Sequence, residues 1–201
     1  MCGGDKTAAH HAARNLVCRF SAAAGLGPEL ERSNLLPPRP GEPADTGLRR
    51  PADVYLPAWD SGTPAALDLA ITPPQRQGSL LEASHRAGAT AKWYEDHKCV
   101  YLDTQRQCEA QGIKFVPVVA ERSSGWGPSA LAVFRKIAKI AAAWDGTPTG
   151  KFMSEYLEGL SVAIRRAAAR AVLKRADARS DFPRRAQAVA MAEVIATEGA
   201  A

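Results

Sequence analysis

The sequence has few cysteines, and none of them are paired in a motif. A CxxC pair is absent, so neither a compact zinc ribbon nor a disulfide framework is expected. Scattered thiols that stay reduced are typical of proteins inside the cell. The four cysteines among the 201 residues are Cys2, Cys18, Cys99 and Cys108.

Long apolar runs and targeting signals are also missing. No run approaches the ~20 apolar residues that a membrane-spanning helix requires, and residues 1–6 lack the charged-then-apolar layout of a secretory signal. We therefore expect a nuclear or cytoplasmic protein with no membrane contact. A metal-dependent nucleotide hydrolase is a weaker alternative, because neither Gly3-Gly4 nor Gly125-Trp126-Gly127 has the context of a phosphate-binding loop.

The positive charge is concentrated in one segment. The net charge is +5, yet residues 161–185 contain eight basic and only two acidic residues, which leaves the remaining chain close to neutral. Such a patch is typical of proteins that bind a polyanion, although a solvated helix face has the same composition. The residues expected to contact such a polyanion are Arg165, Arg166, Arg170, Lys174 and Arg175.

Periodicity and turn residues predict a mixed succession of helices and strands. Helices are expected at 6–24, 89–110, from Pro128, at 152–179 and at 186–197, and strands at 29–31, around Asp53 and Asp68, and at 115–121. Residues 73–88 are expected to form a loop. The fold class is therefore α/β (α+β), a small mixed β-sheet flanked by helices. We divide the chain into an N-terminal helix (1–24), a central domain (25–144) and a basic, alanine-rich helical tail (145–201).

Two aspartates lie in short apolar runs. Asp53 precedes Val54-Tyr55-Leu56, and Asp68 lies inside Leu67–Ile71. The turn-forming residues 60–64 predict that one strand folds back on the other, which places the two acids close together. An ionised carboxylate in an apolar strand needs a partner, and a divalent cation is one. Alternatively, each aspartate only ends a strand.

One lysine interrupts a semi-apolar helix face. Tyr94, Lys98 and Tyr101 recur at spacings of three and four residues within the helix expected at 89–110. A lysine in this position either extends its ammonium to solvent or delivers it into a site.

The order of these elements resembles the PD-(D/E)xK nuclease fold. Residues 2–143 are similar to the restriction-like endonuclease domain of site-specific non-LTR retrotransposons, which carries a basic residue, Pro, Asp, a second Asp and a later Lys. Arg50-Pro51-Ala52-Asp53, Asp68 and Lys98 match these positions, with Ala52 inserted. Residues 94–98, 115–121 and 125–127 also look like segments of retroelement-derived reading frames.

The resemblance implies a restriction-endonuclease-like domain that nicks DNA with Mg²⁺ or Mn²⁺. Asp53 and Asp68 would bind the metal, and Lys98, or Lys92 as a second choice, would act as the catalytic lysine. Glu31, or Glu29, would supply an additional acid. The chain departs from the common pattern because Ala70 occupies the usual lysine position two residues after the second acid.

The same family carries an upstream zinc knuckle, which this chain matches in part. Cys2 with His10 or His11 fits its middle, but two ligands do not hold zinc tightly, so we expect no structural Zn²⁺ and expect both histidines to face solvent. Two alternatives to an enzyme remain: an inactive nucleic-acid-binding remnant of a retroelement, and a helical module that binds a protein partner or associates with itself.

Overall fold

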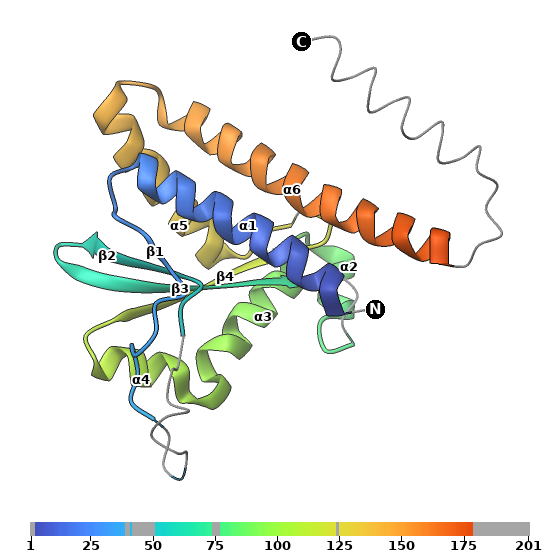
Figure 1. Cartoon of the computed structure of the whole chain (residues 1–201), viewed down its shortest axis with the longest axis horizontal. Coiled ribbons are helices and arrows are strands. Elements are labelled where there is room, and N and C mark those ends of the chain that lie inside the picture. The colour runs from blue at the N-terminus through green and yellow to red at the C-terminus, as the bar shows by residue number, and fades with distance from the viewer. Residues whose placement is uncertain (1–2, 39–40, 42–50, 74–76, 124, 179–201) are drawn as a thin grey trace.

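The computed structural model describes residues 3–38, 41, 51–73, 77–123 and 125–178, with only the backbone described at 3–6 and 175–178. The elements run in the order shown in Figure 1. Their bounds are α1 (Gly3–Ala23), β1 (Glu29–Leu30), β2 (Val54–Asp60), β3 (Thr63–Thr72), α2 (Leu80–His85), α3 (Ala89–Val100), the 3₁₀ turn η1 (Tyr101–Asp103), α4 (Thr104–Ala110), β4 (Lys114–Glu121), α5 (Pro128–Asp145) and α6 (Thr149–Ala178).

Four strands form one mixed sheet in the order β1-β2-β3-β4. The first three are antiparallel neighbours, whereas β4 runs parallel to β3 after a crossover through α2, α3 and α4. Ser61 and Gly62 have φ values of +47° and +88° and make the tight turn between β2 and β3, so the predicted fold-back is confirmed. Pro117 lies on the edge strand β4, where its missing N–H costs least.

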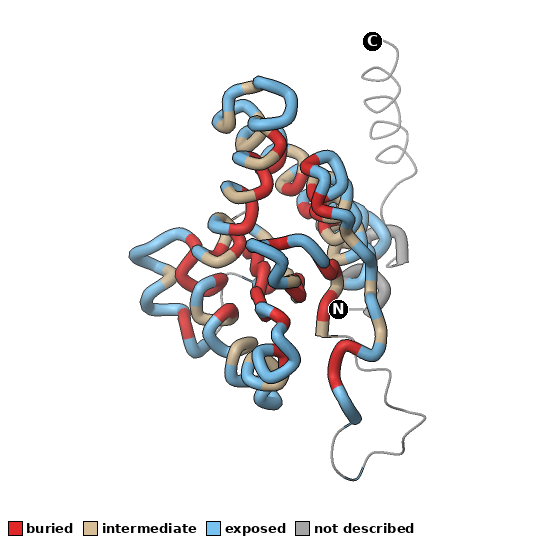
Figure 2. Tube along the Cα trace, turned by 90° about the vertical axis from the view of Figure 1, so that its left-hand side faces the viewer, coloured by how far each residue is buried: buried red, intermediate tan, exposed pale blue. Residues whose placement is uncertain are grey.

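Helices cover both faces of this sheet, which confirms the predicted fold class. On one face, α1 and α5 pack against the strands, and α6 packs against these two helices (Figure 1). On the other face lie α3 and α4. In β2, Val54 and Leu56 are buried on the first face, whereas Tyr55 is buried on the second. Because both faces are covered, consecutive strand residues are buried at the centre of the molecule, and every residue of β4 after Lys114 is buried (Figure 2).

The prediction of one helix over residues 89–110 is wrong. The chain turns sharply at η1, where Leu102 and Asp103 have φ values of +52° and +55°. This turn allows Cys108 of α4 to be fully buried against the sheet while Tyr101 stays exposed. A second correction concerns the expected loop 73–88, because residues 80–85 form the short helix α2.

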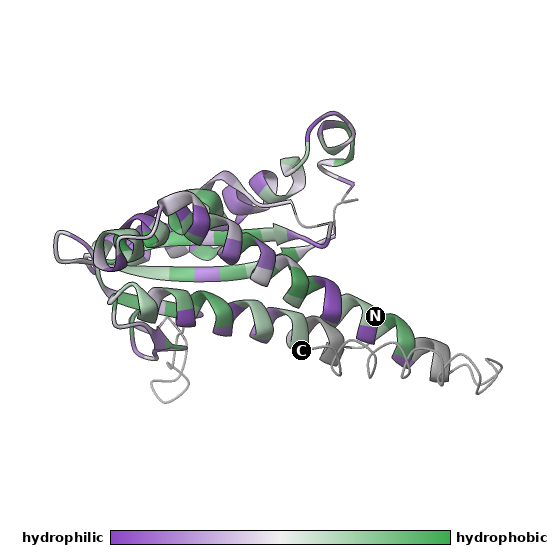
Figure 3. Ribbon diagram, turned by 90° about the horizontal axis from the view of Figure 1, so that it is seen from above, coloured by the Kyte–Doolittle hydropathy of each residue, from purple (hydrophilic) through white to green (hydrophobic). Residues whose placement is uncertain are grey.

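The terminal helices largely follow their sequence signals. Gly25 has a φ of +72° just after α1, and Pro128 opens α5, both as predicted. In α6, polar and apolar residues alternate around the helix (Figure 3). The helix expected at 186–197 lies outside the described residues, and the division into three regions stays a prediction. Within the described residues, no helix is long and apolar enough to cross a membrane.

Candidate functional site

Asp53 lies where β2 begins, beside the centre of β3. Its backbone N–H donates to the Leu67 carbonyl at 2.9 Å, and its Oδ2 accepts the backbone N–H of Leu69 at 2.6 Å. The carboxylate therefore accepts a hydrogen bond from the β3 backbone just before β2 begins. This arrangement fixes the side chain through a main-chain donor.

His10 of α1 binds the same carboxylate oxygen. Its Nε2 lies 3.1 Å from Asp53 Oδ2. The side chains of His10 and Asp53 are 27% and 19% exposed. The hydrogen bond to Asp53 raises the pKa of His10, against the opposing effect of burial. The expectation that His10 faces solvent is therefore wrong, although His11 is exposed as predicted. A signal was present, since His10 continues the buried stripe of Ala13 and Val17 by one helical turn.

Asp68 of β3 and Lys98 of α3 form an ion pair. Lys98 Nζ lies 2.5 Å from Asp68 Oδ2, and the two side chains are 17% and 27% exposed respectively. Burial raises the pKa of Asp68; Lys98 opposes this effect, and the negative charge of Asp53 adds to it. The two aspartates are therefore close enough to interact electrostatically. Lys92 instead pairs with Asp96 at 2.6 Å on the exposed side of α3.

Glu31, the additional acid expected from the resemblance, follows β1. Its backbone N–H donates to the Asp53 carbonyl at 3.1 Å, while its carboxylate forms an ion pair with Arg14 of α1. Glu29 lies on the exposed edge and pairs with Arg32 at 3.0 Å. The main chain of Glu31 thus borders the site, and its carboxylate is engaged with a cation from α1.

Two buried glutamates that the sequence analysis missed hold α3 in place. Glu121, at the end of β4, accepts the N–H groups of Thr90 and Ala91 in the first turn of α3, at 3.1 and 3.2 Å. Such carboxylates satisfy helix N–H groups that lack intrahelical acceptors and match the positive end of the helix dipole. No motif around Glu121 predicted this contact, because Thr90 and Ala91 are 31 and 30 residues away in sequence.

Glu95 makes the corresponding contact from α3 to α5. Its two oxygens accept the N–H groups of Ser129 and Ala130 at 3.0 Å each, and burial raises its pKa. The side chain is only 2% exposed. Because Glu95 and Lys98 lie on the same helix, this contact fixes the rotation of α3 that directs Lys98 toward Asp68.

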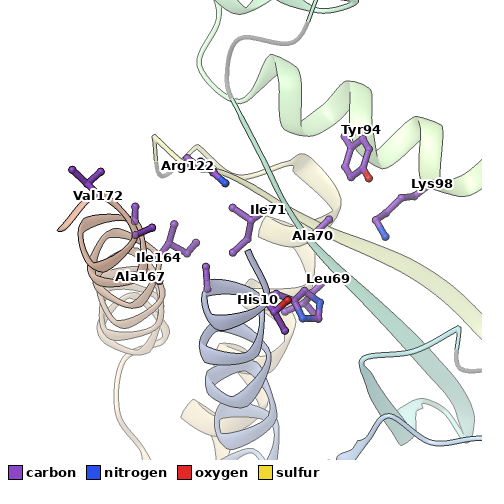
Figure 4. A pocket seen from close by; sticks show the side chains of 14 residues that line it. His10, Leu69, Ala70, Ile71, Tyr94, Lys98, Arg122, Ile164, Ala167 and Val172 are labelled. Carbon is purple, nitrogen blue, oxygen red and sulfur yellow. The ribbon is translucent and has the colours of Figure 1, made fainter. Parts of the chain in front are cut away.

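A cavity of about 430 Å³ opens beside these pairs (Figure 4). Tyr94 and Lys98 project into it from α3, His10 from α1 and Arg122 from the end of β4. The opposite wall is apolar and comes from α6. Asp53 and Asp68 pair with His10 and Lys98, which line the cavity, and each aspartate side chain remains partly open to solvent.

A second hollow, of about 860 Å³, runs between α1 and α6. Four cations line it: Arg19 from α1, and Arg166, Arg170 and Lys174 from α6. Among the described residues that line it there is no acid. Three of the five predicted DNA-contacting residues therefore share one groove. Arg165 is exposed outside it, and the side chain of Arg175 lies outside the described part.

The site combines two interacting carboxylates with a lysine and a histidine, a set suited to binding a cation or a phosphate. The described residues contain no group of three or more His, Cys, Asp or Glu side chains that could hold a metal ion. No protein-family model matches the chain, and no curated protein matches its sequence. The family resemblance therefore stays a prediction.

Proposed function

We propose that the protein is a metal-dependent endonuclease that hydrolyses phosphodiester bonds in DNA. The observation that carries the proposal is the grouping of Asp53, Asp68 and Lys98 from two strands and a helix. The ion pair of Lys98 with Asp68, and the influence of Asp53 on the pKa of Asp68, support it. The order of elements, one helix before three strands and then a crossover to a parallel strand, agrees with the expected restriction-endonuclease-like domain.

The two carboxylates have the chemistry that Mg²⁺ requires. The hydrogen bonds that described residues donate to them all go to Oδ2, which leaves Oδ1 of each aspartate for another ligand. Mg²⁺ commonly binds one or two carboxylates and completes its shell with water and phosphate oxygens, so a third protein acid is not required. When bound, Mg²⁺ or Mn²⁺ would polarise the phosphate and lower the pKa of an attacking water.

The protein side chains supply charge and orientation. The Lys98 ammonium can neutralise charge that develops on the phosphoryl oxygens, and Asp68 holds it in position. His10 and the Leu69 N–H fix the Asp53 carboxylate. Asp53 and Asp68 would hold the cation through the carboxylate oxygens that His10 and Lys98 leave free.

The basic groove between α1 and α6 supports DNA binding. Cations from two helices that are not opposed by carboxylates bind phosphates without regard to base sequence. Arg165 and Arg175 extend the same positive helix in sequence. Binding by this surface alone is the second candidate function, an inactive DNA-binding remnant, and Asp68 neutralised by Lys98 is compatible with it.

Plasmid nicking in Mg²⁺ or Mn²⁺ tests the proposal. Asp53→Asn and Asp68→Asn are expected to abolish nicking while DNA binding measured in EDTA is unchanged. Asp60→Asn is the matched control, because Asp60 lies on the same hairpin but is exposed and pairs with Lys136 at 3.0 Å. Nicking that survives both site substitutions excludes this active site, and binding without any nicking by the wild type leaves the DNA-binding function.

A further inference from the structure

A row of aromatic rings follows α3 away from the candidate site. Trp93, His97 and Tyr101 are four residues apart, with ring centroids 5.7 Å apart for the first pair and 5.6 Å for the second. Tyr94 flanks this row, 6.0 Å from the ring of His97. His97 is exposed, and Tyr101 is 56% exposed. A surface helix has no packing reason to present such a row to water.

Tyr94 connects this row to the cavity beside the aspartates. Tyr94 lines the cavity, and Lys98 Nζ lies 5.8 Å from the centre of its ring. Figure 4 shows Tyr94 and Lys98 projecting from the same side of α3 toward this space. The exposed rings of His97 and Tyr101 therefore continue outward from the position where the proposed chemistry occurs.

The cavity itself is suited to an anion that has an apolar part. Lys98, Arg122 and His10 contribute basic groups, and none of the described residues that line it is acidic. The facing wall is apolar, formed by α6 residues such as Ile164, Ala167 and Val172. A phosphate beside the cations, with its sugar or base against this wall, matches the distribution of charge.

We propose that the cavity and the aromatic row together bind an unpaired strand of DNA. One nucleotide occupies the cavity, and the bases that follow stack on His97 and Tyr101. Stacking on aromatic side chains needs free base faces, which a continuous duplex does not present. This inference rests on the proposed function and narrows its substrate to DNA that is single-stranded, or locally unpaired, at the cleaved bond.

Binding measured in EDTA tests the inference without requiring cleavage. The probes are a short fluorescent oligothymidine, an abasic oligonucleotide of the same length, and a duplex. We expect the wild type to bind oligothymidine more tightly than either of the other probes. Tyr101→Ala is expected to weaken oligothymidine binding about five- to tenfold, and His97→Ala in addition to weaken it further. Neither change is expected to alter binding of the abasic probe, because that probe lacks bases.

Matched variants separate stacking from other effects. Tyr101→Phe is expected to retain wild-type affinity, since the ring remains. Val100→Ala removes a neighbouring side chain that is 75% exposed, and it is expected to have no effect. Ala168→Leu narrows the cavity from the α6 wall and is expected to weaken binding of oligothymidine.

Three results overturn the inference: no binding of oligothymidine by the wild type, equal affinity for duplex and single strand, or a Tyr101→Ala variant that binds like the wild type. If plasmid nicking occurs but Tyr101→Ala changes neither binding nor cleavage, the proposed function stands and the inference is wrong. If nicking is absent while the pattern of binding holds, the aromatic surface stands without the catalytic site.

Discussion

The imidazole of His10 and the carboxylate of Asp53 meet 3.1 Å apart, on the same oxygen that accepts the Leu69 N–H. The contact joins α1 to the strand pair that carries both aspartates. It ties the position of a site carboxylate to the docking of a helix forty-three residues away in sequence.

The stability of the fold should depend on the charge of His10. Because the pKa of His10 is raised above its usual value of 6.5 in the folded state, its contribution is full below pH 6.5 and is lost as pH rises through the folded pKa. We expect His10→Ala to remove about 1 kcal/mol of pH-dependent stability at low pH and little of it at alkaline pH. Urea unfolding in EDTA across the pH range measures this difference. His11→Ala, at the exposed neighbouring position, is the control, and a parallel pH profile for both variants would contradict the prediction.

The ion pair between Lys98 and Asp68 should contribute to the stability of the fold. Lys98→Met leaves Asp68 partly buried without its cation, which is expected to lower the free energy of unfolding by about 1–3 kcal/mol at neutral pH. Adding Asp68→Asn to Lys98→Met should recover part of that loss, because the uncompensated charge is removed. Lys92→Met, which breaks only an exposed pair, should cost at most about 0.5 kcal/mol. Urea unfolding measures both variants. If Lys98→Met and Lys92→Met lower the free energy of unfolding equally, the Asp68–Lys98 pair contributes no more than an exposed pair.

Glu95 should be the most sensitive residue of α3. Glu95→Ala leaves the N–H groups of Ser129 and Ala130 without their acceptors in a buried place, so we expect a loss of about 2–4 kcal/mol. Asp96→Ala changes the next residue, which is exposed, and should cost less than about 0.5 kcal/mol. Chemical denaturation compares the two. A small effect of Glu95→Ala would mean that α5 does not depend on this carboxylate.

Gly127 should not tolerate a side chain. Its φ of −67° suits any residue, but a Cβ at this position would overlap the Glu95 carboxylate. Gly127→Ala is therefore expected to destabilise the fold by about 1–3 kcal/mol through displacement of Glu95. Gly150→Ala, in the first turn of α6 with no atom within 4 Å of the new Cβ, should be neutral or slightly stabilising. Thermal unfolding compares the stability of the two variants. Equal stability of Gly127→Ala and Gly150→Ala would contradict the prediction.

The affinity for DNA should depend on salt concentration through the cations of the basic groove. Arg166→Gln and Arg170→Gln remove two cations from the groove, and each is expected to lower the slope of log affinity against log salt by about 1. Arg135→Gln and Lys139→Gln serve as controls. They remove the same amount of positive charge, but from the exposed side of α5. Equal slopes for both pairs of variants would assign the binding to net charge and not to the groove.

Much of the local structure was accessible from the sequence because its signals are local. The turn residues 60–64 predicted the hairpin, and Pro128 marked the start of a helix, and the structure confirms both. The break at Leu102 was missed because its cause lies elsewhere. The turn at Leu102 allows Cys108 to be buried against the sheet, and no residue near Leu102 predicts that contact.

The chain by itself determined which charged residues sit in apolar strands and helices, because backbone periodicity assigns each side chain to a face. It singled out Asp53, Asp68 and Lys98 on that ground. Only the tertiary structure decided their partners: His10 on Asp53, Lys98 on Asp68, and Glu95 and Glu121 on helix ends. These contacts join segments sixteen or more residues apart, where the packing of helices on the sheet, and not spacing along the chain, sets the distance between two atoms.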